Sequence, residues 1–139
     1  YKDFHPDARA LLDACDSTLK SALYEREPLP QWSVGTVTLL GDACHPMLPF
    51  MAQGAGMAIE DAAELQRALA MHDLEVPLRL RRYALNRWER AARVQARSLR
   101  NGRIFHLLPP MSWGRNLAMA VGGEALLDNP WLYQGPPHP

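Results

Sequence analysis

Asp42 is the residue best placed to do chemistry, because it follows an apolar run that ends in glycine. The run at residues 36–41, TVTLLG, is short and partly β-branched, which predicts a strand covered on both faces. Ligands of open α/β sheets bind at the carboxyl ends of such strands, where Gly41 lets the chain turn. A carboxylate there can accept hydrogen bonds from sugar-type hydroxyls, but Asp is also a common turn residue. Position alone leaves both interpretations open.

The loop after Asp42 is stiffened by proline and then loses its side chains where a helix is expected to begin. Pro46 and Pro49 fix their own backbone angles. The small residues that follow are Ala52, Gly54, Ala55 and Gly56. They leave unpaired N–H groups and the positive end of the helix dipole open to an anionic or electron-rich group. Tight packing of a helix on a sheet also requires small residues, and spacing does not separate the two.

Cys44 and His45 suggest a nucleophile with its base, or a metal site, and the pattern supports neither. Adjacent residues on an extended loop are expected to point apart, and such catalytic pairs are brought together by the fold. A metal site built from Asp42, Cys44 and His45 lacks a fourth ligand at a sensible spacing. We therefore predict no metal, and a packed, hydrogen-bonded His45. Cys15 and Cys44 are expected to be free thiols in a reducing cytoplasm.

The rest of the chain is predicted to be mainly helical. Helices are expected after His5-Pro6, over residues 54–71, over residues 77–103 and around residues 113–121. The expected apolar stripe of the second helix is Ala58, Ala62, Leu65 and Leu69, and that of the third is Leu80, Tyr83, Ala84, Trp88, Ala91 and Leu99. Alternation at residues 23–26 suggests a strand, and Trp32 is a large anchor in a turn-rich connection. We expect Trp88 to lie in the core.

The charge pattern argues against nucleic acid and membrane partners. Fifteen basic residues balance fifteen acidic ones, and no apolar run approaches the length of a membrane-spanning helix. Arg90, Arg93, Arg97 and Arg100 share one helical face, which could bind phosphates. Zero net charge instead favours a solvated face with local pairs such as Glu89 with Arg93.

The central stretch resembles a known motif. Residues 41–62, GDACHPMLPFMAQGAGMAIEDA, are similar to the second flavin-binding motif of the single-component FAD-dependent aromatic hydroxylases. That family includes 4-hydroxybenzoate, 3-hydroxybenzoate, salicylate and 6-hydroxynicotinate hydroxylases. The matching residues are Gly41, Asp42, Ala43, His45, Pro49, Gln53, Gly54, Glu60, Asp61 and Ala62. The family is also resembled by the upstream segment PLPQWSVGTVTLL and the downstream segment RRYALNRWERAARVQARS, and the similarity covers most of residues 1–105. A further resemblance is WLYQG near the end of the sequence.

The resemblance implies a role for each motif residue. Asp42 would bind the ribityl chain of FAD, residues 49–54 would lie along the isoalloxazine ring, and the Ala55 and Gly56 amides would donate to its pyrimidine edge. An oriented dipole there would stabilise charge on the reduced ring. The implied cofactor-binding residues are Gly41, Asp42, Pro49, Ala52, Gln53, Gly54, Ala55, Gly56 and Met57. Phe50 would line the substrate pocket, where some relatives carry His. Ala52 stands where many relatives have Gly, and Gly56 stands where several have Asn.

The resemblance also implies a fold and an activity. The fold would be α/β, a C-terminal fragment of an FAD/NAD(P)-binding Rossmann-like fold that is predominantly helical with one or two strands. Residues 1–73 would end the substrate region and the FAD-binding domain, and residues 74–139 would form a helical region and tail. The activity would be hydroxylation of a small aromatic substrate with NAD(P)H and oxygen, through a flavin hydroperoxide. No general base is identified, and a homo-oligomer stays open.

The family's N-terminal GxGxxG is absent from the sequence, so we expect this piece alone to be inactive. The alternative is a non-catalytic remnant of a flavin site, or a helical interaction module.

Overall fold

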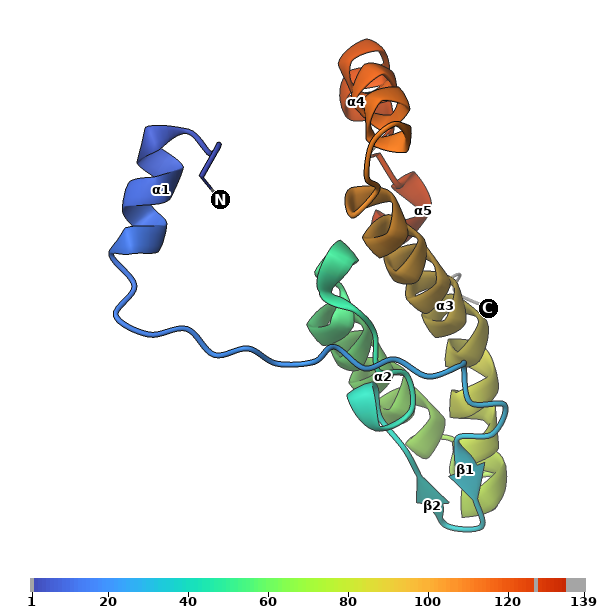
Figure 1. The fold of residues 1–139 in the computed structure, drawn as a ribbon. Coiled ribbons are helices and arrows are strands. Elements are labelled where there is room, and N and C mark those ends of the chain that lie inside the picture. The colour runs from blue at the N-terminus through green and yellow to red at the C-terminus, as the bar shows by residue number, and fades with distance from the viewer. Residues whose placement is uncertain (1, 127, 135–139) are drawn as a thin grey trace.

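The computed structural model of the protein describes residues 2–126 and 128–134. It is mainly helical, and the described residues form one two-stranded sheet (Figure 1). The elements in chain order are α1 (Pro6–Asp13), β1 (Ser33–Val34), β2 (Val37–Thr38), η1 (Gly41–Ala43), η2 (Pro49–Met51), α2 (Gly54–Leu69), α3 (Val76–Phe105), α4 (Met111–Gly122), η3 (Gly123–Leu126) and α5 (Pro130–Tyr133). This secondary structure confirms the prediction of a predominantly helical fragment with one or two strands.

The helices α2 and α3 lie side by side and form the body of the structure (Figure 1). Both were predicted, and their observed bounds differ from the expected ones by no more than two residues. Pro77 occupies the first turn of α3, where the missing N–H is no loss because that turn has no intrahelical acceptor. These two helices position everything that surrounds the Asp42 turn.

The buried faces of both helices are more polar than the predicted apolar stripes. The buried residues of α2 are Met57, Asp61 and Ala68, while Ala62 and Leu69 are exposed. The buried residues of α3 are Leu80, Tyr83, Arg87, Ala91, Val94, Gln95, Ser98 and Gly102. The predicted stripe of α2 was therefore wrong at Ala62 and Leu69, while Ala58 and Leu65 are half-buried and Leu65 packs against the core. Ion pairs and loop contacts, which hydrophobic periodicity does not register, set the rest of this face.

The predicted buried strand at residues 36–41 is instead half of a very short hairpin. Strands β1 and β2 pair antiparallel, with Ser33 opposite Thr38 and Val34 opposite Val37. Ser33 Oγ donates to the Leu80 carbonyl of α3 at 3.0 Å, which fixes the hairpin to that helix. Val37 is 68% exposed, and no further strand pairs with the hairpin in the described part of the chain.

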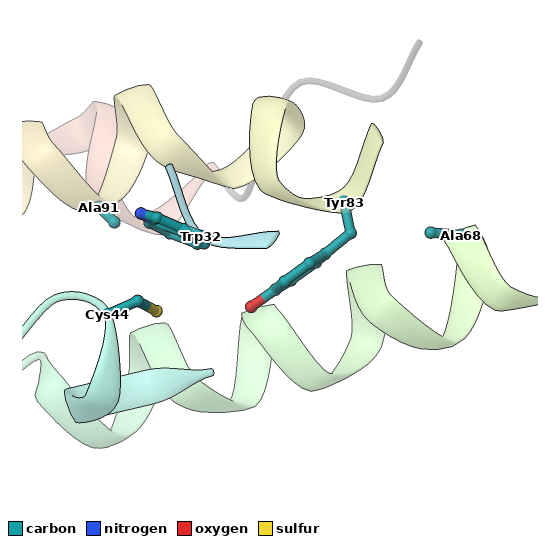
Figure 2. Close-up of a cluster of buried hydrophobic side chains, with 5 residues drawn as sticks. All are labelled: Trp32, Cys44, Ala68, Tyr83 and Ala91. Carbon is teal, nitrogen blue, oxygen red and sulfur yellow. The ribbon is translucent and has the colours of Figure 1, made fainter. Parts of the chain in front are cut away.

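The main apolar cluster lies between α2, α3 and the hairpin, and consists of Trp32, Cys44, Ala68, Tyr83 and Ala91 (Figure 2). The Trp32 and Tyr83 rings are 5.9 Å apart, and Tyr83 Oη donates to the Leu39 carbonyl at 3.2 Å. Trp32 is thus the anchor that the sequence predicted. Trp88 is not in this core: it is 39% exposed on the flank of α3, where its Nε1 donates to the Leu29 carbonyl.

The N-terminal part of the chain contributes little to the core. Helix α1 has no buried residue and lies away from α2 and α3 at the end of a long extended segment (Figure 1). The strand predicted at residues 23–26 is not formed, because the extended backbone there has no neighbouring strand to pair with. The alternating pattern predicted the backbone conformation but not a partner.

The C-terminal helices follow the end of α3. Helix α4 confirms the helix expected around residues 113–121. Helix α5 contains most of the WLYQG segment, whose final Gly135 lies outside the described residues. Within residues 2–126 and 128–134, every helix is too short or too polar to cross a lipid bilayer.

Candidate functional site

The Asp42 turn is a tight 3-10 turn that begins at Gly41. The backbone N–H groups of Cys44 and His45 both donate to the Gly41 carbonyl, at 2.9 and 3.0 Å. Gly41 is buried with a φ of +60°, and a Cβ there would lie 3.2 Å from the Ala58 Cβ of α2. A side chain at this position would therefore be strained in its backbone and crowded against the helix. The turn leaves Asp42 itself exposed.

The N-terminus of α2 presents free backbone donors beside Asp42. The first intrahelical bond runs from the Met57 N–H to the Gln53 carbonyl, and no side chain caps this end of the helix. The N–H groups of Gly54, Ala55 and Gly56 consequently have no acceptor within the helix. The Asp42 Oδ1 atom lies 3.8 Å from the position that a Gly54 Cβ would occupy. The structure thus brings together the carboxylate and the helix end that the sequence singled out.

The loop between the turn and α2 is held by a row of polar side chains on α3. Gln95 Nε2 donates to the Pro46 carbonyl at 2.9 Å, Ser98 Oγ donates to the Leu48 carbonyl, and Asn101 Nδ2 donates to the Phe50 carbonyl at 3.2 Å. Three donors spaced three residues apart thereby satisfy alternate carbonyls of the loop. Sequence reasoning missed this row, although its regular spacing on one helical face was visible.

The remaining predicted site residues lie around this loop. Pro49 begins η2, and Ala52 ends it in a left-handed conformation with φ 52° and ψ 34°. The Phe50 ring packs edge-on against Phe105 and His106, with centroids 6.2 and 5.3 Å away. Met57 is buried in a second cluster with Val94 and Leu132, so its side chain faces the core.

A buried ion-pair network, which the sequence did not predict, lies directly beneath the turn. Asp61 Oδ1 accepts a bond from Arg87 Nε at 2.7 Å. Asp61 Oδ2 accepts from the Gly41 N–H at 3.1 Å and lies 2.5 Å from His45 Nε2. Next to it, Glu60 binds the guanidinium groups of Arg87 and Arg90 at 2.6 to 2.7 Å. Two carboxylates and three basic groups thus join the turn, α2 and α3.

The network fixes the charges of its members. Burial favours a neutral imidazole, but the hydrogen bond with Asp61 and the nearby Cys44 side chain prevail and raise the pKa of His45 from 6.5 to about 9. Burial also opposes ionisation of Asp61, yet the bonds from His45 and Arg87 hold its pKa below the usual value. The bonds from Arg90 and Arg87 lower the pKa of Glu60 against its burial. At neutral pH these groups are ionised and paired.

The geometry corrects one expectation about Cys44 and His45 and confirms another. Cys44 and His45 do not point apart: their ligand atoms and those of Asp61 lie within 4.8 Å of one another. Both carboxylate oxygens of Asp61 already have hydrogen-bond donors, so Asp61 and His45 form part of an ion-pair network. His45 is 1% exposed, which confirms the packed, hydrogen-bonded histidine.

The arginine face of α3 is not a simple solvated face. Arg90 donates to the Trp131 and Leu132 carbonyls of α5 in addition to Glu60. The Arg93 guanidinium lies 3.9 Å from the Trp131 ring centroid, which replaces the expected pair with Glu89. These contacts hold α5 against α3.

The comparisons with known proteins agree with this geometry. Residues 17–98 match the family described as FAD binding domain. The 6-hydroxynicotinate 3-monooxygenase of Pseudomonas fluorescens is 52% identical over 98 residues, which are 68% of this chain and 25% of that protein. The 3-hydroxybenzoate 6-hydroxylase of Polaromonas naphthalenivorans is 45% identical over 101 residues, or 73% of this chain and 25% of that protein.

The chain belongs to the FAD-dependent aromatic hydroxylase family.

Solved structures show the same relationship. A salicylate hydroxylase substrate complex superposes with a TM-score of 0.60 at 30% identity. The match covers 81% of this chain and 28% of that chain. The structure of FqzB superposes with a TM-score of 0.66 at 35% identity, over 81% of this chain and 26% of that one. The chain thus spans about a quarter of the length of these proteins.

The residues around the start of α2 fit the cofactor of this hydroxylase family. Three backbone donors without intrahelical partners suit the electron-rich edge of a flavin ring. The glycines at positions 54 and 56 keep this helix end open, and Asp42 offers an exposed carboxylate beside it. Hydrogen-bond donors, small residues and an acceptor for hydroxyl groups therefore occur in one place.

Proposed function

We propose that this chain forms the part of a flavin site that holds the ribityl chain and the pyrimidine edge of FAD. Asp42 would accept hydrogen bonds from ribityl hydroxyls, and the Ala55 and Gly56 N–H groups would donate to the ring. Gly41, Pro49, Ala52, Gln53, Gly54 and Met57 would complete the backbone surface around the cofactor. The observation that carries this proposal is the exposed Asp42 carboxylate beside the uncapped start of α2.

The proposed reaction is hydroxylation of a small aromatic compound with NAD(P)H and oxygen. FAD would supply the redox and oxygen chemistry when bound. The helix dipole of α2 would favour negative charge at the ring edge, because backbone donors already aimed at that edge need not reorganise. The loop bonded by Gln95, Ser98 and Asn101 would keep the ring in position.

The relatives and Phe50 support a proposal for the substrate class. Related proteins are named for hydroxynicotinate and hydroxybenzoate substrates. Phe50 offers an apolar ring, already packed against Phe105 and His106, that can stack on an aromatic substrate but cannot donate a hydrogen bond. We therefore propose a hydroxylated aromatic or pyridine carboxylate whose polar groups are bound by other parts of the intact enzyme.

Two measurements on the intact protein test this function. In the first, NADH and NADPH oxidation is followed with a panel of hydroxybenzoates and hydroxypyridine carboxylates, and the products are identified. Stimulated oxidation with a hydroxylated product supports the proposal, while a flavoprotein that no aromatic compound stimulates contradicts the reaction. In the second, Asp42→Ala is compared with Asp73→Ala, which removes an exposed carboxylate from the turn between α2 and α3. Only Asp42→Ala should lose FAD.

A further inference from the structure

The Asp61 side chain is the point at which three separate segments meet. Its carboxylate accepts the Gly41 N–H at 3.1 Å and the Arg87 Nε at 2.7 Å, and it lies 2.5 Å from His45 Nε2. Asp61 is fully buried, at 0% exposure, so water does not compete for these bonds. Bonds between charged groups in such a place are stronger than ordinary hydrogen bonds.

Two of these bonds hold opposite ends of the turn that carries Asp42. Gly41 precedes Asp42, His45 closes the turn, and the carbonyl of Gly41 accepts the His45 backbone N–H. Asp61 therefore fixes the turn to α2, two helical turns from the free N–H groups of that helix. The third bond, from Arg87, ties the same carboxylate to α3.

The surroundings make the network depend on the charge of His45. Asp61 is faced by Cys44 and His45 from the turn, and by Arg87 and Tyr83 from α3. Glu60 and Arg90 form a second pair beside Arg87. The Trp32 ring packs against His45 with the ring centroids 5.3 Å apart, and His45 Nδ1 is buried without a hydrogen-bond partner. When His45 loses its proton, Asp61 loses one of its two cationic partners.

We propose that Asp61, together with His45 and Arg87, is a positioning residue for FAD that sets the Asp42 carboxylate against the N-terminus of α2. This rests on the proposed flavin site, and adds that the affinity for FAD depends on a buried network outside the proposed cofactor contacts. Since the pairing with Asp61 outweighs the opposing effect of burial and raises the pKa of His45 to about 9, FAD binding should weaken as the pH rises through that value.

The test is the dissociation constant of FAD, measured by flavin fluorescence on the intact apoprotein between pH 7 and pH 10. Asp61→Asn keeps the shape of the side chain but removes its charge, and should weaken FAD binding about tenfold or more at pH 7.5. His45→Gln keeps a donor for Asp61 but cannot titrate. It should therefore lack the rise in dissociation constant that the wild type shows near pH 9. Because any titration of free flavin is the same for both proteins, comparing wild type with His45→Gln removes its contribution.

The matched control is Glu64→Gln. Glu64 also links α2 to α3, because it accepts a bond from Asn86 at 2.7 Å, but it does not contact the turn. The Glu64→Gln protein should have the same affinity for FAD and the same pH profile as the wild type. Equal loss of FAD in Glu64→Gln and Asp61→Asn would show that any α2–α3 link has this effect, and would overturn the proposal.

The outcomes separate this inference from the flavin site itself. Wild-type protein that binds no FAD overturns both. If Asp42→Ala loses FAD but Asp61→Asn binds it within about twofold of wild type, the flavin site stands and the positioning role is wrong. If Asp61→Asn does not fold, the pH profiles of wild type and His45→Gln decide, and identical profiles reject the role.

Discussion

Gly102 provides a test of how the proposed substrate residue is held. A Cβ on this buried glycine of α3 would lie 2.6 Å from two carbons of the Phe50 ring, closer than atoms of this kind approach in proteins. The ring cannot easily move away, because Phe105 and His106 pack against it and Asn101 binds the Phe50 carbonyl. Gly102→Ala therefore forces a displacement of Phe50 or of α3.

The magnitude follows from two opposing effects. Alanine in a helix interior is more stable than glycine by about 1 kcal/mol. Overpacking of a rigid site costs about 1–3 kcal/mol. We expect Gly102→Ala to be destabilised by about 1 kcal/mol overall, since the clash involves two ring atoms. If Phe50 lines the substrate pocket, the same variant should also raise KM for the aromatic substrate.

The matched control is Gly114→Ala in α4, where a Cβ would meet nothing within 4 Å. This variant should be more stable than wild type by up to about 1 kcal/mol, with an unchanged KM. Both variants are measured by urea denaturation of the intact protein and by steady-state kinetics. A Gly102→Ala protein as stable as Gly114→Ala would refute the contact between Phe50 and α3.

Three further predictions concern the turn and its network. Ala52→Gly should increase the free energy of unfolding by about 1 kcal/mol, measured by urea denaturation, because Ala52 holds a left-handed conformation that glycine adopts without strain. The pKa of His45 is raised from 6.5 to about 9, so its contribution is complete below pH 6.5 and lost as the pH rises through about 9. Urea denaturation from pH 6 to 10 should show a loss of about 3 kcal/mol, and none in His45→Gln. Arg87→Met should cost about 3–5 kcal/mol in the same assay, because it leaves the buried Asp61 carboxylate without its guanidinium partner, and a cost below about 1 kcal/mol would contradict that pairing.

The parts of the site that are local in sequence could be predicted. Gly41, Asp42 and the small residues around the start of α2 lie within sixteen positions, and turn chemistry and helix-end chemistry act over such distances. The structure places Asp42 at the start of α2 as the order of these residues indicates. The helices α2 and α3 were found because their patterns are long.

The parts that depend on tertiary contacts could not be predicted. Arg87 lies 26 residues from Asp61, and nothing in the local pattern of α3 indicates that this arginine, rather than a neighbour, is buried. Hydrophobic periodicity also placed Trp88 inside, but Trp88 is 39% exposed and the neighbouring Arg87 is buried. The strand predicted at residues 36–41 forms only at Val37–Thr38 and is not covered on both faces, since the described residues contain no larger sheet.

The most direct test of the account is a crystal structure of the intact protein with FAD bound. The account predicts an Asp42 carboxylate oxygen within hydrogen-bond distance of a ribityl hydroxyl, and the Ala55 and Gly56 N–H groups directed at the pyrimidine edge of the ring. A flavin ring bound away from residues 42–57 would contradict it.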